Sequence, residues 1–482
     1  MRFTLKETRL GLRNSTTRLP FRYGVACLTW CPQAVLRATI EVNGRCFRGY
    51  AGDGLPPGWF DKSPGKTFED QIKAMIQAIA VAEKTFLAEA TRPVTFFPAW
   101  NAVQDRTHRS GREDGVENLL VSFGVSMVER AVMDAMARAA KSTFADAVRQ
   151  NLYAVEPGEI HPELAGLEPR DWLPPAPAEQ VFVRHTVGLS DPVTIDDIPD
   201  EDALDDGYPH ALEQYIRSDG ICYFKIKVAN DLDSDLPRLV KIARVIERHL
   251  GDRYQITLDG NEQYKSADEF DRLTHAIRHD DALATLWSNT LLIEQPLERH
   301  IALSDEHTHR IRELANDKPV IIDESDGDVH AYRRAIDLGY RGVSSKNCKG
   351  PVKSLLNAGL TWFHNDHGTR PTYYMTGEDL CCVGVVPVQA DLCLVATLGL
   401  AHSERNGHHY HQGISYLPED QQRAALAAHG DFYRQHHDRI APWVRNGRFH
   451  IGSLQCPGFG FESEPDLDSM SNPEQWQPVE TS

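Results

Sequence analysis

From residue 181 onward, the chain repeats one unit: a short, β-rich apolar run followed by a helical pattern. The runs are VFVRHTVGL (181–189), CYFKIKV (222–228), YQITLDG (254–260), TLLIEQP (290–296), PVIIDES (319–325), GVSSKNC (342–348) and TYYMTGE (372–378). Strands that alternate with helices in this way predict a parallel sheet. With an eighth, less clear run near 391–413, the pattern favours a closed (β/α)₈ barrel of the TIM type over an open sheet.

The residues before these repeats have an irregular α+β pattern. Residues 35–52 predict a hairpin that turns at Asn43-Gly44. Thr67 and Asp70 have the spacing of a capping box, which predicts a helix that begins there. This region therefore reads as an α+β capping domain.

A proline-rich stretch, LEPRDWLPPAPAEQ (167–180), marks the boundary between the two patterns. We expect a capping domain over residues 1–175 and a barrel over 176–430. Residues 431–482 are expected to return to the capping domain. The final stretch from residue 463 is polar and acidic, and it is expected to be a disordered tail.

The net charge of −18 bears on the partners of the chain. So acidic a surface repels nucleic acid and anionic membranes, and no block rich in Lys and Arg offsets it. No apolar run approaches the roughly 20 residues that span a bilayer, and the start lacks the apolar core of a signal peptide. We therefore expect a cytoplasmic protein that binds neither nucleic acid nor membranes.

Three acidic residues each follow an apolar run on successive predicted strands: Asp259, Glu294 and Asp323. In a barrel the carboxyl ends of the strands meet at one face, where active sites are built. Unpaired carboxylates in one place would repel each other and shift each other's pKa. A hard divalent cation removes this repulsion, and oxygen ligands favour Mg²⁺ or Mn²⁺ over Zn²⁺. The alternative is that each acid only caps a helix or pairs with a nearby lysine.

Lysines flank these acids along the chain. Lys225 and Lys227 lie two positions apart on one predicted strand, so their side chains share a face. Lys346 ends the sixth strand. Neighbouring ammonium groups near a cation lower each other's pKa, and a lysine whose pKa is near neutrality can act as a general base. The alternative is a pair of lysines on a solvated strand face.

The motifs FKIKV, LDGN, LIEQP, IDES and SSKNCKG occur in this order, about one strand–helix unit apart. NGRFHIGSLQCPGFGFE (446–462) then ends the series with a Pro-Gly-x-Gly motif. In these features the chain resembles, over nearly its whole length, the enolase superfamily and its muconate lactonizing branch. It departs from the mandelate racemase branch, because the seventh strand ends in YYMTGEDL without a histidine. The usual acid-sugar dehydratase pattern is therefore disfavoured.

The resemblance implies a metal-dependent enzyme that removes a proton from the carbon next to a carboxylate and forms an enolate. Such an enzyme would racemise, epimerise, cycloisomerise or carry out syn elimination on a small carboxylic acid, as an isomerase or lyase. Superfamily members use a Lys or His base with Mg²⁺. By motif, the implied roles are base for Lys227, opposite acid/base for Lys346, charge tuning for Lys225, metal ligands for Asp259, Glu294 and Asp323, support for Asn261 and Gln295, and a candidate polar contact for Glu378.

Some features stay open. Arg22 and residues 51–59 lie where the family's capping loops meet substrate, but the sequence does not say which residues make contact. The segment HSERNGHHYH (402–411) suggests a metal site, although a loop near the eighth strand is favoured. A non-catalytic relative with the same fold is one rival, and a metal-dependent hydrolase is another. The hydrolase is disfavoured because none of the strand ends named above carries a histidine. We also expect a homo-oligomer.

Overall fold

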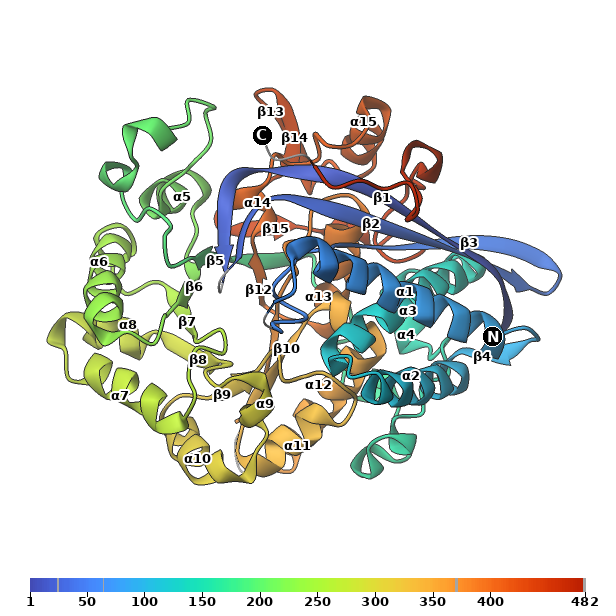
Figure 1. Ribbon diagram of the computed structural model, residues 1–482, viewed down its shortest axis with the longest axis horizontal. Coiled ribbons are helices and arrows are strands. Elements are labelled where there is room, and N and C mark those ends of the chain that lie inside the picture. The colour runs from blue at the N-terminus through green and yellow to red at the C-terminus, as the bar shows by residue number, and fades with distance from the viewer. Residues whose placement is uncertain (24–25, 64, 369–371, 480–482) are drawn as a thin grey trace.

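The computed structural model describes residues 1–23, 26–63, 65–368 and 372–479. It has a barrel of parallel strands covered at one side by a layer of long antiparallel strands and helices (Figure 1). The long strands come from the start of the chain, and the segment around Ser471 lies beside them.

Eight parallel strands form the barrel, in the order in which they occur along the chain. They are β5 (Gln180–Val187), β6 (Tyr223–Lys227), β7 (Gln255–Asp259), β8 (Thr290–Glu294), β9 (Val320–Ile322), β10 (Gly342–Ser345), β11 (Tyr374–Gly377) and β12 (His402–Arg405). Pairing of β12 with β5 closes the sheet, which confirms the predicted barrel. The eighth strand lies within the predicted 391–413 range but is shorter.

Helices connect the strands and form the outer layer of the barrel (Figure 1). They are α5 (Leu212–Asp219), α6 (Leu232–Leu250), α7 (Ala267–Arg278), α8 (Ala284–Ser288), α9 (Arg299–Ala302), α10 (Thr308–Asp317), α11 (Ala331–Leu338), α12 (Pro351–Asp366) and α13 (Val386–Leu398). Most carry an apolar stripe on one face, as in α6, where Leu239, Ala243 and Ile246 are buried. The stripes pack the helices onto the sheet.

The capping region contains a four-stranded sheet in the order β3-β2-β1-β4. Its elements are β1 (Arg2–Tyr23), β2 (Ala26–Val42), β3 (Arg45–Gly54), α1 (Phe68–Glu89), β4 (Val94–Thr95), α2 (Phe96–Glu113), α3 (Asn118–Ala140) and α4 (Phe144–Arg149). The predicted turn joins β2 to β3, with φ of 51° at Asn43 and 76° at Gly44. The capping box of Thr67 and Asp70 opens α1. Both local predictions are confirmed.

Helix α3 joins the capping region to the barrel. The Ser126 hydroxyl donates to the Cys348 carbonyl at 3.0 Å, and Glu129 Oε1 accepts from the Val352 backbone N–H at 2.8 Å. Cys348 lies in the segment between β10 and α12, and Val352 lies in the first turn of α12. Because Lys346 begins this segment, α3 supports the backbone that carries it.

The chain after the barrel returns to both parts of the molecule. Its elements are α14 (Gly407–Tyr410), α15 (Glu419–Ala428), β13 (Tyr433–His436), β14 (Arg439–Pro442) and β15 (Arg448–His450). Strand β15 adds antiparallel to β5. The Phe459 ring then stacks on Phe144 of α4, with 3.7 Å between ring centroids.

The prediction of a disordered tail is wrong for residues 463–479. Leu467 and Trp476 are buried, and the Trp476 indole N–H donates to Asn14 Oδ1 at 2.9 Å. Ser471 pairs with Leu12 of β1. Two large apolar side chains therefore anchor an otherwise polar segment on the capping sheet. The average composition of the segment, on which the prediction of disorder rested, does not reveal these two anchors.

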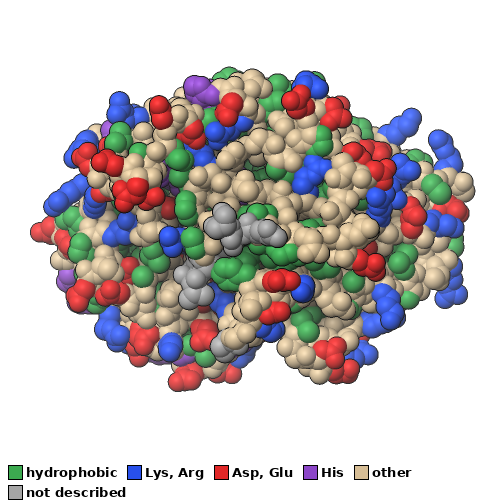
Figure 2. Space-filling view, turned by 45° about the horizontal axis from the view of Figure 1, so that its top comes forward, with side chains coloured by type: hydrophobic (Ala, Val, Ile, Leu, Met, Phe, Trp, Pro, Cys, Tyr) green, Lys and Arg blue, Asp and Glu red, His purple; other side chains and the backbone are tan. Residues whose placement is uncertain are grey.

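Acidic and basic side chains are interspersed over the face in Figure 2, so on that face the negative charge is not gathered in one patch. No helix in the described parts of the chain is long and apolar enough to cross a membrane.

Candidate active site

A pocket lies between the capping region and the carboxyl ends of the barrel strands. The capping region contributes Phe21, Pro56, Gly58, Trp59 and Lys62 to its lining. The barrel side contributes Lys225, Lys227, Asn261, Asp323, Lys346, Asp379, Leu380, Cys381, Glu404 and Asn406. Five of the predicted site residues thus share one pocket. Asp259, Glu294 and Glu378 do not line it, but each contacts Lys225.

Lys225 on β6 is enclosed by carboxylates. Its Nζ lies 2.7 Å from Glu294 Oε1, 2.7 Å from Glu378 Oε2, 3.0 Å from Glu404 Oε2 and 3.1 Å from Asp259 Oδ2. These partners come from the ends of β7, β8, β11 and β12. The buried ammonium group therefore links acids from both sides of the barrel.

The pKa of Lys225 is raised well above its usual value. Burial disfavours the charged form, but the attraction of Asp259, Glu294 and Glu404 outweighs it. These acids outweigh the effect of the nearby Lys227 on the Lys225 ammonium group, and the lowered pKa expected for two lysines beside a cation stays a prediction. The sequence shows that two lysines are adjacent, but not how many acids surround them.

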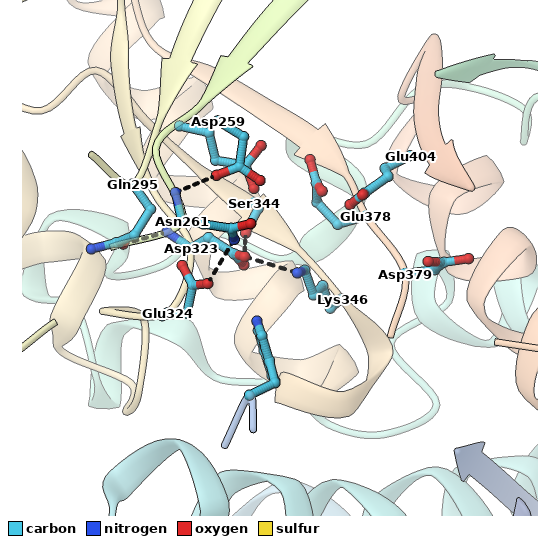
Figure 3. Close-up of polar contacts among 12 residues, drawn as sticks. Asp259, Asn261, Gln295, Asp323, Glu324, Ser344, Lys346, Glu378, Asp379 and Glu404 are labelled. Atoms are coloured by element: carbon cyan, nitrogen blue, oxygen red, sulfur yellow. Dashed lines mark hydrogen bonds and ion pairs between the residues drawn. The ribbon is translucent and has the colours of Figure 1, made fainter. Parts of the chain in front are cut away.

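Lys227, on the same face of β6, donates to Asn261 Oδ1 and lies 3.5 Å from Asp259 Oδ2. The Asn261 backbone N–H donates to Asp259 Oδ1 at 2.8 Å. Its side-chain amide donates to Glu324 Oε1 at 3.3 Å. Asn261 therefore fixes the position of Lys227 relative to the acids, as Figure 3 shows for Asp259, Asn261 and Glu324.

Lys346, which follows β10, donates to Asp323 Oδ2 at 2.8 Å (Figure 3). The other oxygen of Asp323 accepts from the Ser344 hydroxyl at 2.5 Å and contacts Lys349 Nζ at 2.9 Å. Burial opposes the charge on Lys346, but Asp323 outweighs it and raises the Lys346 pKa. The Lys346 ammonium also lies 4.5 Å from the centroid of the Trp59 ring.

Gln295 holds the backbone that carries Asp323. Its Oε1 accepts from the backbone N–H of Asp323 at 2.8 Å and of Ser325 at 3.2 Å. Its amide nitrogen donates to the Leu297 carbonyl at 2.7 Å. Gln295 therefore links the ends of β8 and β9.

The two lysines proposed from sequence as acid and base stand opposite each other. β6 and β10 are four strands apart in either direction around the eight-stranded barrel. Lys227 and Lys346 both line the pocket. A small molecule in this pocket would therefore have one ammonium group on each side.

Two of the three acids have carboxylate oxygens that are free to bind a divalent cation. Asp259 Oδ2 and Glu294 Oε2 are buried and accept no hydrogen bond from the described residues, although Lys225 and Lys227 lie within 3.5 Å of the former. Both oxygens of Asp323 are in contact with Ser344 or lysines. No three His, Cys, Asp or Glu side chains in the described residues are grouped closely enough to hold a metal ion. The unsatisfied oxygens of Asp259 and Glu294 are of the hard type that Mg²⁺ prefers, whereas a metal ion at Asp323 would have to replace one of that residue's present contacts.

Several charged residues of the site were missed from the sequence. Glu404 contacts Lys225 and accepts from the Thr186 hydroxyl at 2.6 Å. Arg184 pairs with Glu378, so Glu378 belongs to a buried ionic network. Lys349 is buried against Asp323. Lys349 could have been found from the sequence, because it is the second lysine of the motif SSKNCKG. Glu404 gave no such signal, because it lies in a short polar strand.

The histidine-rich segment 402–411 is β12 followed by α14, which corrects the expectation of a loop. His402 Nδ1 accepts from Arg184 at 2.6 Å, and His409 Nδ1 is 2.5 Å from the Tyr215 hydroxyl. His411 Nε2 is 3.2 Å from Cys381 Sγ. These side chains contact protein groups in this structure.

No family model matches the sequence. No curated protein matches it either. Solved structures do match the fold. N-succinyl Arg/Lys racemase from Bacillus cereus is 16% identical, with a TM-score of 0.57 and 98% of each chain covered. Muconate lactonizing enzyme from Pseudomonas fluorescens, complexed with muconolactone, is 15% identical, with a TM-score of 0.56 and coverage of 98% of this chain and 97% of that one.

A third similar structure is a dipeptide epimerase from Enterococcus faecalis, complexed with Mg and the dipeptide L-Leu-L-Tyr. It is 12% identical, with a TM-score of 0.54 and coverage of 83% of this chain and 90% of that one. At such identities the likeness concerns the fold.

Proposed function

We propose that this chain, which has the fold of the enolase superfamily, is an enzyme that removes a proton from the carbon next to a carboxylate. The observation that carries the proposal is the placement of Lys227 at the end of β6 and of Lys346 directly after β10, on opposite sides of the barrel and both lining one pocket. Proton removal on one face and proton return on the other racemise or epimerise a carbon centre. This is the reaction that the site supports best.

The two lysines have different surroundings, which suggest different roles. Lys346 has a raised pKa, so it begins as an ammonium group that can donate a proton. Lys227 contacts an amide oxygen and one more distant carboxylate, and it is proposed as the base. Lys225 keeps its positive charge beside the acids and favours the developing negative charge on the substrate.

We further propose that Asp259, Glu294 and Asp323 hold Mg²⁺, with Mn²⁺ as a substitute. The buried oxygens of Asp259 and Glu294 without hydrogen bonds support this set. When bound, such a cation neutralises the charge that develops on the carboxylate oxygens of the substrate. The Mg in the dipeptide epimerase structure supports the choice of metal.

The substrate is proposed to be a small carboxylic acid. Racemases, epimerases and muconate lactonizing enzyme are among the proteins with this fold, which supports a carboxylate substrate. On the capping side, Phe21 and Trp59 offer aromatic surface and Lys62 offers a cation. We expect these residues to contact the part of the substrate away from the reacting carbon.

A screen of carboxylic acids tests the proposal. Purified protein, Mg²⁺ and each acid are incubated in D₂O, and deuterium at the α-carbon is followed by NMR. At least one acid should gain deuterium faster than in a sample without protein. A chiral assay then identifies inversion, whereas a new ring or double bond would identify cycloisomerisation or elimination. Binding of carboxylates without exchange for any acid would favour the non-catalytic alternative.

A further inference from the structure

An ionic triad, of which Glu262 and Arg299 are buried and Lys62 is partly exposed, joins the capping region to the barrel beside the pocket. Glu262, in the loop after β7, receives hydrogen bonds from Arg299 Nε and Nη2, both at 2.7 Å. The Arg299 backbone N–H also donates to Glu262 Oε1, at 2.9 Å. Lys62 of the capping region donates to the other oxygen of Glu262. The Arg299 and Glu262 side chains are only 7% and 3% exposed, so this ion pair is shielded from water.

The same guanidinium group also holds the capping backbone directly. Arg299 Nη2 donates to the Trp59 carbonyl at 2.7 Å, and Nη1 donates to the Phe60 carbonyl at 3.0 Å. One side chain therefore binds two successive carbonyls of the capping segment 55–62 and one carboxylate of the barrel. The planar arginine fork suits such a task, whereas the ammonium of lysine cannot make all of these contacts at once.

The segment held in this way forms one wall of the pocket. Phe60 packs into the capping region against Phe123 of α3, with 4.6 Å between ring centroids. Trp59 faces the pocket, and its ring centroid is 4.5 Å from the Lys346 ammonium. Lys346 is almost wholly buried, at 4% exposed. Trp59 thus covers the lysine proposed above as the acid.

We propose that Arg299 is a positioning residue, which ties the capping segment 55–62 to the barrel and thereby holds the Trp59 ring over Lys346. The effect on catalysis by Lys346 rests on the proposed function, whereas the tie between segment 55–62 and the barrel does not. If the tie is loosened, Trp59 moves away from Lys346 and water gains access to the ammonium group. Substrate binding would then also have to order this wall of the pocket, which costs binding free energy.

The first test needs no substrate. In Arg299→Lys, hydrogen exchange of the backbone amides in 55–62 should rise roughly tenfold or more, because a charge-assisted tie is lost. Acetylation of Lys346 by a limiting amount of acetic anhydride, measured by peptide mass spectrometry, should also become several-fold faster. Glu262→Gln keeps the shape of the partner but removes its charge, and it should shift both readouts in the same direction.

Arg149→Lys is the matched control. Arg149 also donates to two successive carbonyls, of Leu173 and Pro174, but none of these residues lines the pocket. This variant should leave exchange in 55–62 and acetylation of Lys346 as in the wild-type chain. If Arg299→Lys and Glu262→Gln both leave the two readouts within about twofold of wild type, the inference is overturned.

The second test uses a substrate from the D₂O screen. Arg299→Lys should raise KM more than it lowers kcat. In a double-mutant cycle with Trp59→Leu, the two effects on kcat/KM should be less than additive, because Arg299 acts through Trp59. Fully additive effects would contradict the positioning role. If wild type incorporates deuterium into no carboxylic acid, while hydrogen exchange in 55–62 and acetylation of Lys346 still change in the variants, the proposed function fails. The role of Arg299 in holding the segment is then still supported.

Discussion

The ammonium group of Lys225 has contacts within 3.1 Å to four carboxylates that come from four strands. Taking charges out of water is costly, and a buried group of this kind is tolerable only when its partners are all present. Removal of Lys225 would leave Asp259, Glu294, Glu378 and Glu404 close together with less opposing charge. Lys227 has fewer acidic contacts, since among the described residues only Asp259 has a carboxylate oxygen within 4.0 Å of the Lys227 Nζ.

We therefore predict that Lys225→Ala destabilises the chain by roughly 3–5 kcal/mol, the usual effect of breaking a buried ion pair. Lys227→Ala should cost clearly less. Added Mg²⁺ should raise the thermal unfolding midpoint of Lys225→Ala more than that of wild type, because the cation replaces part of the lost charge. Differential scanning calorimetry measures both effects. Equal losses in the two variants would contradict the account of the Lys225 network.

The proposed metal ligands give a second prediction at the scale of single residues. Asp259→Asn and Glu294→Gln should each weaken Mg²⁺ binding roughly tenfold or more, because a neutral amide is a poorer ligand for a hard cation. Asp268→Asn, on the exposed side of α7, is the control and should bind as wild type does. Isothermal titration of the chelator-treated protein gives the affinities. Unchanged affinity in both Asp259→Asn and Glu294→Gln would remove these two residues from the proposed ligands.

At the scale of elements, α3 and α12 meet at Glu129, which is fully buried. Burial raises the pKa of Glu129 to about 7, although the Val352 backbone N–H favours the charged form. A carboxyl group whose pKa is raised on folding binds its proton more tightly in the native state. Its contribution to stability is therefore present below its unfolded pKa and is lost as pH rises through about 7.

Glu129→Gln keeps the acceptor for Val352 and has no proton to lose. From about pH 5 to about pH 8, the wild-type chain should lose stability relative to this variant, by up to about 3 kcal/mol. Urea unfolding followed by circular dichroism at several pH values gives the difference. A stability difference that is the same at all pH values would show that Glu129 does not titrate as its burial implies.

The strands that the sequence predicted well are those with an apolar run before a charged end, such as β7 and β8. This pattern also predicted that Asp259 and Glu294 lie next to each other. In the structure the two residues are register partners on neighbouring strands, which confirms the prediction. Strand β12 has the sequence HSER, without an apolar run, and pairing with β5 determines its conformation. Glu404 was missed for this reason.

Contacts between the capping region and the barrel could not be predicted in the same way. Lys62 and Glu262 are 200 positions apart, and Trp59 meets Lys346 only because the two regions dock. The sequence indicated that residues 51–59 lie near the substrate, but no periodicity or motif specifies which side chain meets which. The number of acids around Lys225 could not be predicted for a similar reason, since these partners come from the ends of four separate strands.

At the scale of the whole molecule, the end of the chain docks on its beginning. Trp476 is buried near Trp30 of β2, with ring centroids 6.5 Å apart, and Arg9 pairs with Asp468 at 2.6 Å. The chain thus starts in the capping sheet, builds the barrel and returns. The expected homo-oligomer stays a prediction, which analytical ultracentrifugation would test.

We predict that Trp476→Ala destabilises the capping region by about 3 kcal/mol, as expected for loss of a large buried aromatic side chain. Glu474→Ala, an exposed position in the same segment, should have almost no effect. The urea unfolding midpoint of each variant provides the comparison. A midpoint for Trp476→Ala equal to that of Glu474→Ala would mean that the tail does not contribute to stability.

The central claim is that Lys227 and Lys346 act on opposite faces of one carbon. It is tested most directly by deuterium incorporation at the α-carbon of each enantiomer of a substrate in D₂O, with wild type, Lys227→Ala and Lys346→Ala. Wild type should exchange and invert both enantiomers. Each variant should lose inversion by roughly 10²–10⁴-fold, the usual worth of a general acid or base. Each should also keep exchange of only one enantiomer, a different one for each variant. Wild-type rates of inversion in both variants would contradict the claim.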